Sequence, residues 1–92
     1  MFAMFYSVTN ISELKLNVGD SVRYSHGDNI WQGYYVGLAD KLIRLLPKKF
    51  RESENRNCFV VVRDFKNINN PRYWKTVIDI IPAKEFEKYI QI

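Results

Sequence analysis

The chain has 92 residues, of which 47% are hydrophobic and 15% aromatic, and its formal net charge is +4 at pH 7. This length suits one domain with its own core, and the hydrophobic content is too high for a disordered tail. No apolar run approaches the roughly 20 residues that a membrane-spanning helix needs. We therefore expect a single globular domain over residues 1–92 that has no membrane partner.

The amino terminus and the cysteine content both favour a cytoplasmic protein. Residues 1–8 are apolar, but they lack the basic leader and the small-residue cleavage site of a secretory signal. The single cysteine, Cys58, can form no internal disulfide and no thiolate metal cluster. A reducing, cytoplasmic compartment fits both features. The frequent Asn, Ile and Lys residues fit an AT-rich source such as a bacteriophage or an AT-rich bacterium.

Short runs of β-type residues follow one another along the chain, separated by turn residues. The runs are Phe2–Val8, Leu14–Val18, Ser21–Tyr24, Ile30–Gly37, Leu42–Leu46, Phe59–Val62 and Tyr73–Ile81. We expect five or six strands from them. The run of residues 59–62 is apolar throughout, which indicates a central strand buried on both faces. The polar stretches at 25–29, 48–57 and 66–71 are predicted to be loops.

The carboxyl-terminal segment is predicted to be one short helix over residues 83–90. Phe86, Tyr89 and Ile90 lie at i, i+3 and i+4, which gives a single apolar stripe. About five short, twisted antiparallel strands tend to curl and close, because closure removes exposed edges. The predicted fold class is therefore mostly β, a small barrel with one helix at its carboxyl-terminal end.

About a third of the chain shows a sequence resemblance. Residues 16–24 read Leu-Asn-Val-Gly-Asp-Ser-Val-Arg-Tyr, residues 31–37 read Trp-Gln-Gly-Tyr-Tyr-Val-Gly, and residues 41–45 read Lys-Leu-Ile-Arg-Leu. Over residues 14–46 this pattern resembles the opening of a KOW or Tudor-type barrel. The resemblance implies a Src-homology-3-like barrel of five to six antiparallel strands that binds nucleic acid or protein. The amino-terminal strand, the loop at 48–57 and the predicted helix depart from that pattern, so function does not transfer directly.

Residues suited to catalysis are scarce. His26 is the only histidine, and Cys58 lies at the start of a run that looks buried, where a reactive thiolate is disfavoured. No phosphate-binding glycine loop or nucleophile elbow is present, and a zinc site would need carboxylates to complete its ligands. Residues 18–22 are also similar to the start of MazF-like ribonucleases, but that family's Arg-Pro pair has no counterpart after Gly33. We expect no enzyme, no cofactor, no metal and no small-molecule substrate.

Positive charge is concentrated in one third of the chain. Eight basic and three acidic side chains give residues 48–78 a net charge of +5. Such asymmetry indicates a polyanionic partner. Cations interleaved with amides and aromatic rings on loops are suited to contacts with phosphates and bases. The candidate phosphate contacts are Lys48, Lys49, Arg51, Arg56, Lys66, Arg72 and Lys75.

Aromatic side chains supply the second candidate set. Alternation along residues 30–37 puts Trp31 and Tyr35 on one face of the strand, and Trp74 lies beside the second basic loop. Exposed rings beside cations stack on unpaired bases, and the same residue types dominate protein hot spots. Trp31, Tyr35 and Trp74 are therefore the candidate aromatic contacts.

Two functions follow from these residues. The first is a non-catalytic barrel that binds nucleic acid, DNA or RNA, through basic loops. The alternative is a small protein of the kind that bacteriophages encode, which docks on a larger host enzyme and modulates or blocks it. Both would use one surface, with the lysines and arginines dominant in the first and the aromatic rings in the second. Sequence specificity and oligomeric state stay open.

Overall fold

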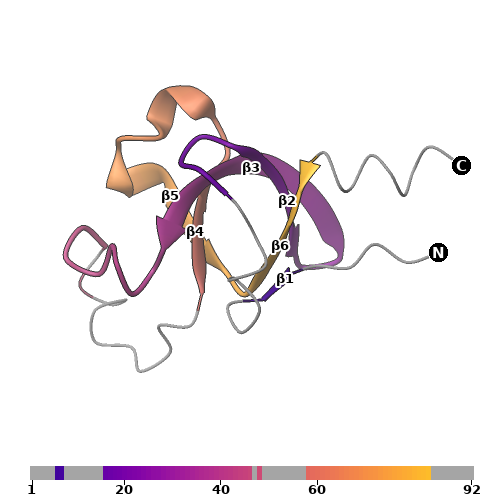
Figure 1. The fold of residues 1–92 in the computed structure, drawn as a ribbon, viewed down its shortest axis with the longest axis horizontal. Coiled ribbons are helices and arrows are strands. Elements are labelled where there is room, and N and C mark those ends of the chain that lie inside the picture. The colour runs from indigo at the N-terminus through magenta and orange to yellow at the C-terminus, as the bar shows by residue number, and fades with distance from the viewer. Residues whose placement is uncertain (1–5, 8–15, 47, 49–57, 84–92) are drawn as a thin grey trace, which may run out of the picture.

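The computed structural model describes residues 6–7, 16–46, 48 and 58–83. Within them, six strands form one antiparallel sheet in the order β1-β6-β2-β3-β4-β5 (Figure 1). The strands are β1 (Tyr6–Ser7), β2 (Ser21–His26), β3 (Asn29–Leu38), β4 (Phe59–Val62), β5 (Trp74–Val77) and β6 (Asp79–Pro82). Two short 3₁₀ helices, η2 (Phe65–Asn67) and η3 (Pro71–Tyr73), lie between β4 and β5. The mostly β prediction is confirmed. The predicted helix lies outside the described residues from position 84 onward.

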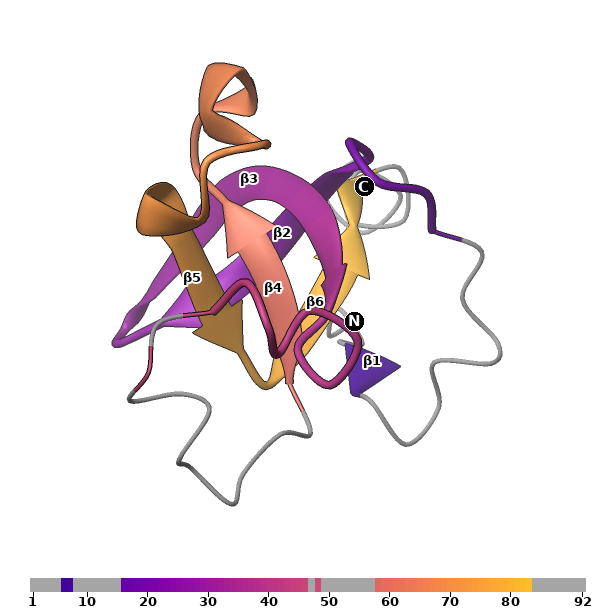
Figure 2. The same cartoon turned by 90° about the vertical axis from the view of Figure 1, so that its left-hand side faces the viewer.

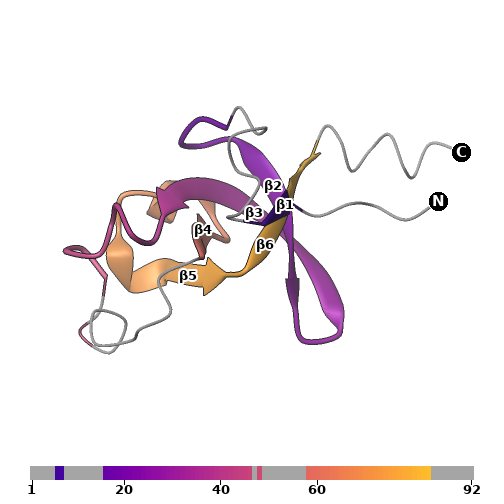
Figure 3. The same cartoon turned by 60° about the horizontal axis from the view of Figure 1, so that its bottom comes forward.

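The β2–β3 hairpin is the longest pairing in the sheet. It runs from the pair Ser21 and Tyr34 to the pair His26 and Asn29. Only Gly27 and Asp28 form the turn, so the predicted five-residue loop is wrong in its length. Gly27 has φ +63°, which suits the first central position of a tight hairpin turn. In Figure 3 the hairpin extends beyond the rest of the sheet.

Strand β3 is strongly curved, as the arc in Figure 2 shows. Its pairing with β4 shifts register between Tyr35 and Gly37, which marks a bulge, and bulges bend strands. Upstream of the bulge, the backbones of β3 and β4 approach each other closely at Gly33. A Cβ atom there would lie 2.6 Å from the carbonyl oxygen of Val62 and 2.9 Å from the Tyr24 ring. A residue without a side chain is therefore required at position 33.

The predicted single strand over residues 73–81 is wrong, because the chain turns at Ile78. Residues 74–77 pair with β4, whereas β6 pairs with β2 and β1. Tyr73 belongs to η3 and Ile78 is exposed. The physical reason is the curl of the sheet, which lets two consecutive strands join different neighbours.

Two other predicted strands are also absent. Residues 39–46 form successive turns in place of the strand at 42–46, with Leu42 N–H donating to Leu38 and Ala39 carbonyls at 3.1 Å. Their apolar side chains cover the sheet instead of extending it. Residues 16–20 form a turn, in which Asp20 N–H donates to Asn17 O at 3.0 Å. Residues 14–15 lie outside the described residues.

The sheet has apolar clusters on both faces, and β4 supplies both of them. The first cluster comprises Val22, Tyr24, Tyr35, Phe59, Val61, Val77 and Ile80. The second comprises Val36, Ala39, Leu46, Cys58, Val60 and Val62. All four β4 residues are buried, so the prediction of a doubly buried central strand is confirmed. Residues 39–46 and the β4–β5 connection contribute to the second cluster and cover that face.

Candidate nucleic-acid interface

The segment that runs from the end of β4 into the start of β5 carries most of the exposed positive charge in the described chain. We call residues 63–75, which include the first two residues of β5, the basic connection. It holds one acidic residue, Asp64, against four basic residues, a net charge of +3. All four cations are exposed, and the segment projects from the sheet at the upper left of Figure 1. The basic residues are Arg63, Lys66, Arg72 and Lys75.

The backbone of the basic connection is held by a series of tight turns. Asn70 accepts a hydrogen bond on its side-chain oxygen from the amide of Arg72 at 3.2 Å, and Pro71 opens η3. Asparagine and proline favour these conformations, because one bonds its own backbone and the other has a fixed φ. The amides that donate to carbonyls three residues earlier, at 2.9–3.0 Å, belong to Asn67, Ile68, Asn70 and Tyr73. The cations are therefore presented on an ordered segment.

Trp74 stabilises the basic connection through a hydrogen bond, which we call the brace. Its indole Nε1–H donates to the carbonyl oxygen of Ile68 at 2.9 Å, so the bond spans η3. The ring is half-buried and packs with Ile68 against the second cluster. Sequence reasoning assigned Trp74 to ligand contact, but its N–H is already used and its ring supports the protein. Trp74 is a positioning residue for the connection.

Arg63 is held over an aromatic ring at the start of the connection. Its guanidinium carbon lies 4.5 Å from the centre of the Trp31 ring, within range of a cation–π interaction. Trp31 is half-buried and packs against the first cluster. Burial raises the pKa of the Tyr24 hydroxyl, and the positive charge of Arg63 partly opposes that rise. Arg63 thus keeps its charge exposed while its side chain is fixed.

Tyr35 was predicted to be an exposed contact, but its side chain is buried. Its side chain is 8% exposed, and its ring meets Phe59 edge-on with centroids 6.3 Å apart. Burial also raises the pKa of its hydroxyl. The alternation that pairs Trp31 with Tyr35 is correct, but that face is the one that packs into the core. Tyr35 is therefore a core residue and not an exposed ring on which a base could stack.

The predicted phosphate contacts divide into three groups. Lys66, Arg72 and Lys75 lie on the basic connection, and each of them is exposed. Lys48 is exposed but lies in the separate segment between β3 and β4. The other three, Lys49, Arg51 and Arg56, lie outside the described residues.

Three residues of the site are absent from the predicted contacts. Arg63 follows the buried strand by one residue and shares the face of Val61 by alternation, a signal that could have been read. Phe65 is 55% exposed and Tyr73 is 53% exposed. Both rings lie next to a cation in sequence, but an aromatic residue in a loop is ordinarily read as buried.

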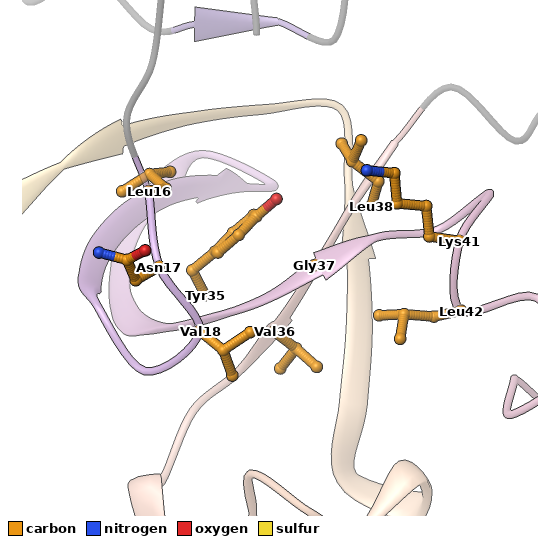
Figure 4. Close-up of a pocket in the computed structure, with 9 residues that line it drawn as sticks. All are labelled: Leu16, Asn17, Val18, Tyr35, Val36, Gly37, Leu38, Lys41 and Leu42. Carbon is orange, nitrogen blue, oxygen red and sulfur yellow. The ribbon is translucent and has the colours of Figure 1, made fainter. Parts of the chain in front are cut away.

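A second surface feature lies beside the carboxyl-terminal half of β3. It is an open hollow of about 330 Å³. In the view of Figure 4, Tyr35 lies between Leu16 and Asn17 on one side and Leu38 and Lys41 on the other. Val18, Val36, Gly37 and Leu42 complete its lining. Apolar side chains dominate, so this hollow suits an apolar group.

The residues with acid–base or nucleophilic chemistry are placed apart. His26 is exposed beside the hairpin turn, whereas Cys58 is buried in the second cluster. Burial raises the pKa of the Cys58 thiol, which keeps it protonated near neutral pH. Among the described residues, no group of three His, Cys, Asp or Glu side chains could hold a metal ion. No helix in this part of the chain is long and apolar enough to cross a membrane.

A scan against protein-family models finds no matching family, and searches of curated proteins and of solved structures find no match. Functional assignment therefore depends on the geometry of the chain itself.

Proposed function

We propose that this chain is a small β-barrel domain that binds nucleic acid through the basic connection and catalyses no reaction. Barrel closure is supported by the position of two consecutive strands. In the order β6-β2-β3-β4-β5, the strands β5 and β6 lie at opposite ends, yet Ile78 alone separates them in sequence. Neighbouring Cα atoms are about 3.8 Å apart, so Val77 and Asp79 lie within about 7.6 Å of each other and the two ends of this five-strand unit come together. The Src-homology-3-like resemblance has the same implication.

The observation that carries the binding proposal is the set of four exposed cations on one braced segment. Phosphate oxygens are bound mainly by such Lys and Arg side chains, and these contacts fix position without reading sequence. Ordering of the segment in the free protein reduces the entropy lost on binding. Arg63 and Arg72 also offer planar guanidinium groups that can contact two phosphate oxygens at once. The function that follows is binding with little sequence preference.

A fluorescence anisotropy titration tests this proposal. Labelled single- and double-stranded oligonucleotides are titrated with the full chain at two salt concentrations. We expect dissociation constants of roughly 1–100 μM at physiological salt, which rise steeply as salt increases. A failure to bind either oligonucleotide at tens of micromolar protein and about 50 mM salt would contradict the proposal, because phosphate contacts are strongest there.

The hollow beside β3 favours a second candidate function, docking on a host protein that the chain modulates. Val18 lines the hollow and is strongly exposed. The next residue in the chain, Gly19, lies against the Phe65 ring of the basic connection. An apolar side chain of a partner could fill the hollow, as hot-spot residues fill pockets. If the chain docks on a host protein, capture of that partner from host lysate should persist after nuclease treatment. The Val18→Asp variant should no longer capture it. The nucleic-acid reading predicts nuclease-sensitive capture that Val18→Asp leaves intact.

A further inference from the structure

Phe65 is an exposed aromatic ring that the protein holds in place. More than half of its surface is open to solvent, at 55%. Its ring meets Tyr34 edge-on, with centroids 5.3 Å apart and an interplanar angle of 79°. The backbone of Gly19 lies against the same ring, since a Cβ atom there would be 3.3 Å from Phe65 Cε2. Contacts from two other segments thus fix the ring while leaving the rest of it exposed.

The backbone beneath Phe65 is fixed as well. Phe65 opens η2, and its carbonyl accepts a hydrogen bond from the Ile68 amide at 3.0 Å. The Ile68 carbonyl in turn accepts the Trp74 indole N–H. A ring held open on such a rigid support can receive a ligand with little ordering of the protein. The chemistry of that ligand is set by the exposed cations at positions 63 and 66, on either side of Phe65 in the chain.

We infer that Phe65 is a stacking platform for an unpaired base, so that the basic connection binds single-stranded nucleic acid in preference to duplex. This inference rests on the proposed function. Arg63 and Lys66 contact the phosphates of the strand, and one of its bases lies on the open part of the Phe65 ring. The bases of a duplex are stacked on each other, so their faces cannot reach the ring. A single strand presents them, and stacking tolerates any base.

The test compares two labelled single strands of about ten nucleotides, a length on the scale of small single-strand-binding domains. One is oligothymidylate, and the other has the same phosphate backbone with every base removed. We expect the wild-type chain to bind oligothymidylate more tightly than the abasic strand. Phe65→Ala should weaken binding of oligothymidylate by about 5- to 150-fold and binding of the abasic strand by less than about twofold. Phe65→Trp should retain the difference between the strands.

Two further variants guard against a folding defect. Phe65→Leu keeps an apolar side chain against Tyr34 and Gly19 but has no aromatic face, so it should behave like Phe65→Ala. Leu45→Ala removes an equally exposed apolar side chain, 56% exposed, in the separate segment 39–46 and should bind like the wild type. Thermal melting of each variant confirms that the comparison is made between folded proteins.

The outcomes separate this inference from the proposed function. If the wild type binds both strands equally and with salt dependence, phosphate binding stands and the stacking platform is wrong. If Phe65→Ala and Phe65→Leu weaken both strands alike, or neither, the stacking platform is also wrong. If the wild type binds no oligonucleotide, the proposed function itself fails.

Discussion

Val61 and Lys75 face each other across β4 and β5, but their surroundings differ completely. Val61 is fully buried in the first cluster, whereas Lys75 is exposed. Val61→Ala should lower the free energy of unfolding by about 1–3 kcal/mol, because it removes two methyl groups and leaves a cavity. Lys75→Ala should change it by no more than about 0.5 kcal/mol. Urea denaturation measures both, and equal midpoints would contradict the assigned burial.

Gly33 is needed because a side chain has no room there, whereas Gly27 is needed because its φ is positive. Substitutions at the two positions distinguish these reasons. Gly33→Ala places a Cβ atom against the Val62 carbonyl, a backbone atom that cannot move aside without disturbing β4. We expect it to destabilise the chain by about 1–3 kcal/mol or more. Gly27→Asn should cost less, about 1 kcal/mol, because nothing lies within 4 Å of a Cβ atom there and only the positive φ disfavours a side chain. Thermal melting that ranks the two variants in reverse would refute this account of the hairpin.

At the scale of elements, the brace from Trp74 to Ile68 makes a specific prediction. Trp74→Phe keeps most of the ring but removes the N–H donor, so one hydrogen bond worth about 0.5–1.5 kcal/mol is lost. Hydrogen exchange should quicken at the amides of Asn67, Ile68, Asn70 and Tyr73. Amides of β2, which pairs with β3 and β6 and not with the strand that holds Trp74, should exchange as in the wild type. Unchanged exchange in the connection would show that its turns hold without the brace.

Sequence periodicity predicted those elements whose pattern is local. The valine run of β4 and the alternation of β3 were correctly assigned. Burial on both faces gives a continuous apolar run, and burial on one face gives alternation of apolar and polar residues. The break at Ile78 was not predicted, because it depends on the curl of the whole sheet. The turns at residues 39–46 were missed for a related reason. Leu42, Ile43 and Leu46 pack in the second cluster, and a short apolar run of that kind reads equally well as a strand.

Within the candidate site, the cations were easier to predict than the rings. Lys66, Arg72 and Lys75 were identified because charge on a loop is almost always exposed. Tyr35 was misassigned because alternation separates two faces without saying which one is the core. The hydrogen bond of Trp74 was not predicted, because its partner, the Ile68 carbonyl, is a backbone group with no sequence signal. Phe65 could be recognised only once Tyr34 and Gly19 were seen to hold it.

At the scale of the whole molecule, the central claim is that binding depends on where the cations lie and not on net charge. Lys66→Ala with Arg72→Ala, and Lys41→Ala with Arg44→Ala, each remove two exposed positive charges, so both lower the net charge from +4 to +2. The first pair lies on the basic connection and the second on the turns at 39–46. The two double variants are therefore matched in charge and differ only in location.

The most direct measurement is the slope of log affinity against log salt for a duplex oligonucleotide, in the wild type and both double variants. Each phosphate contact contributes about 0.9 to that slope, so loss of Lys66 and Arg72 should reduce its magnitude by up to about 1.8. Loss of Lys41 and Arg44 should leave it near the wild-type value. Equal slopes in the two double variants would contradict the assignment of the basic connection as the nucleic-acid interface.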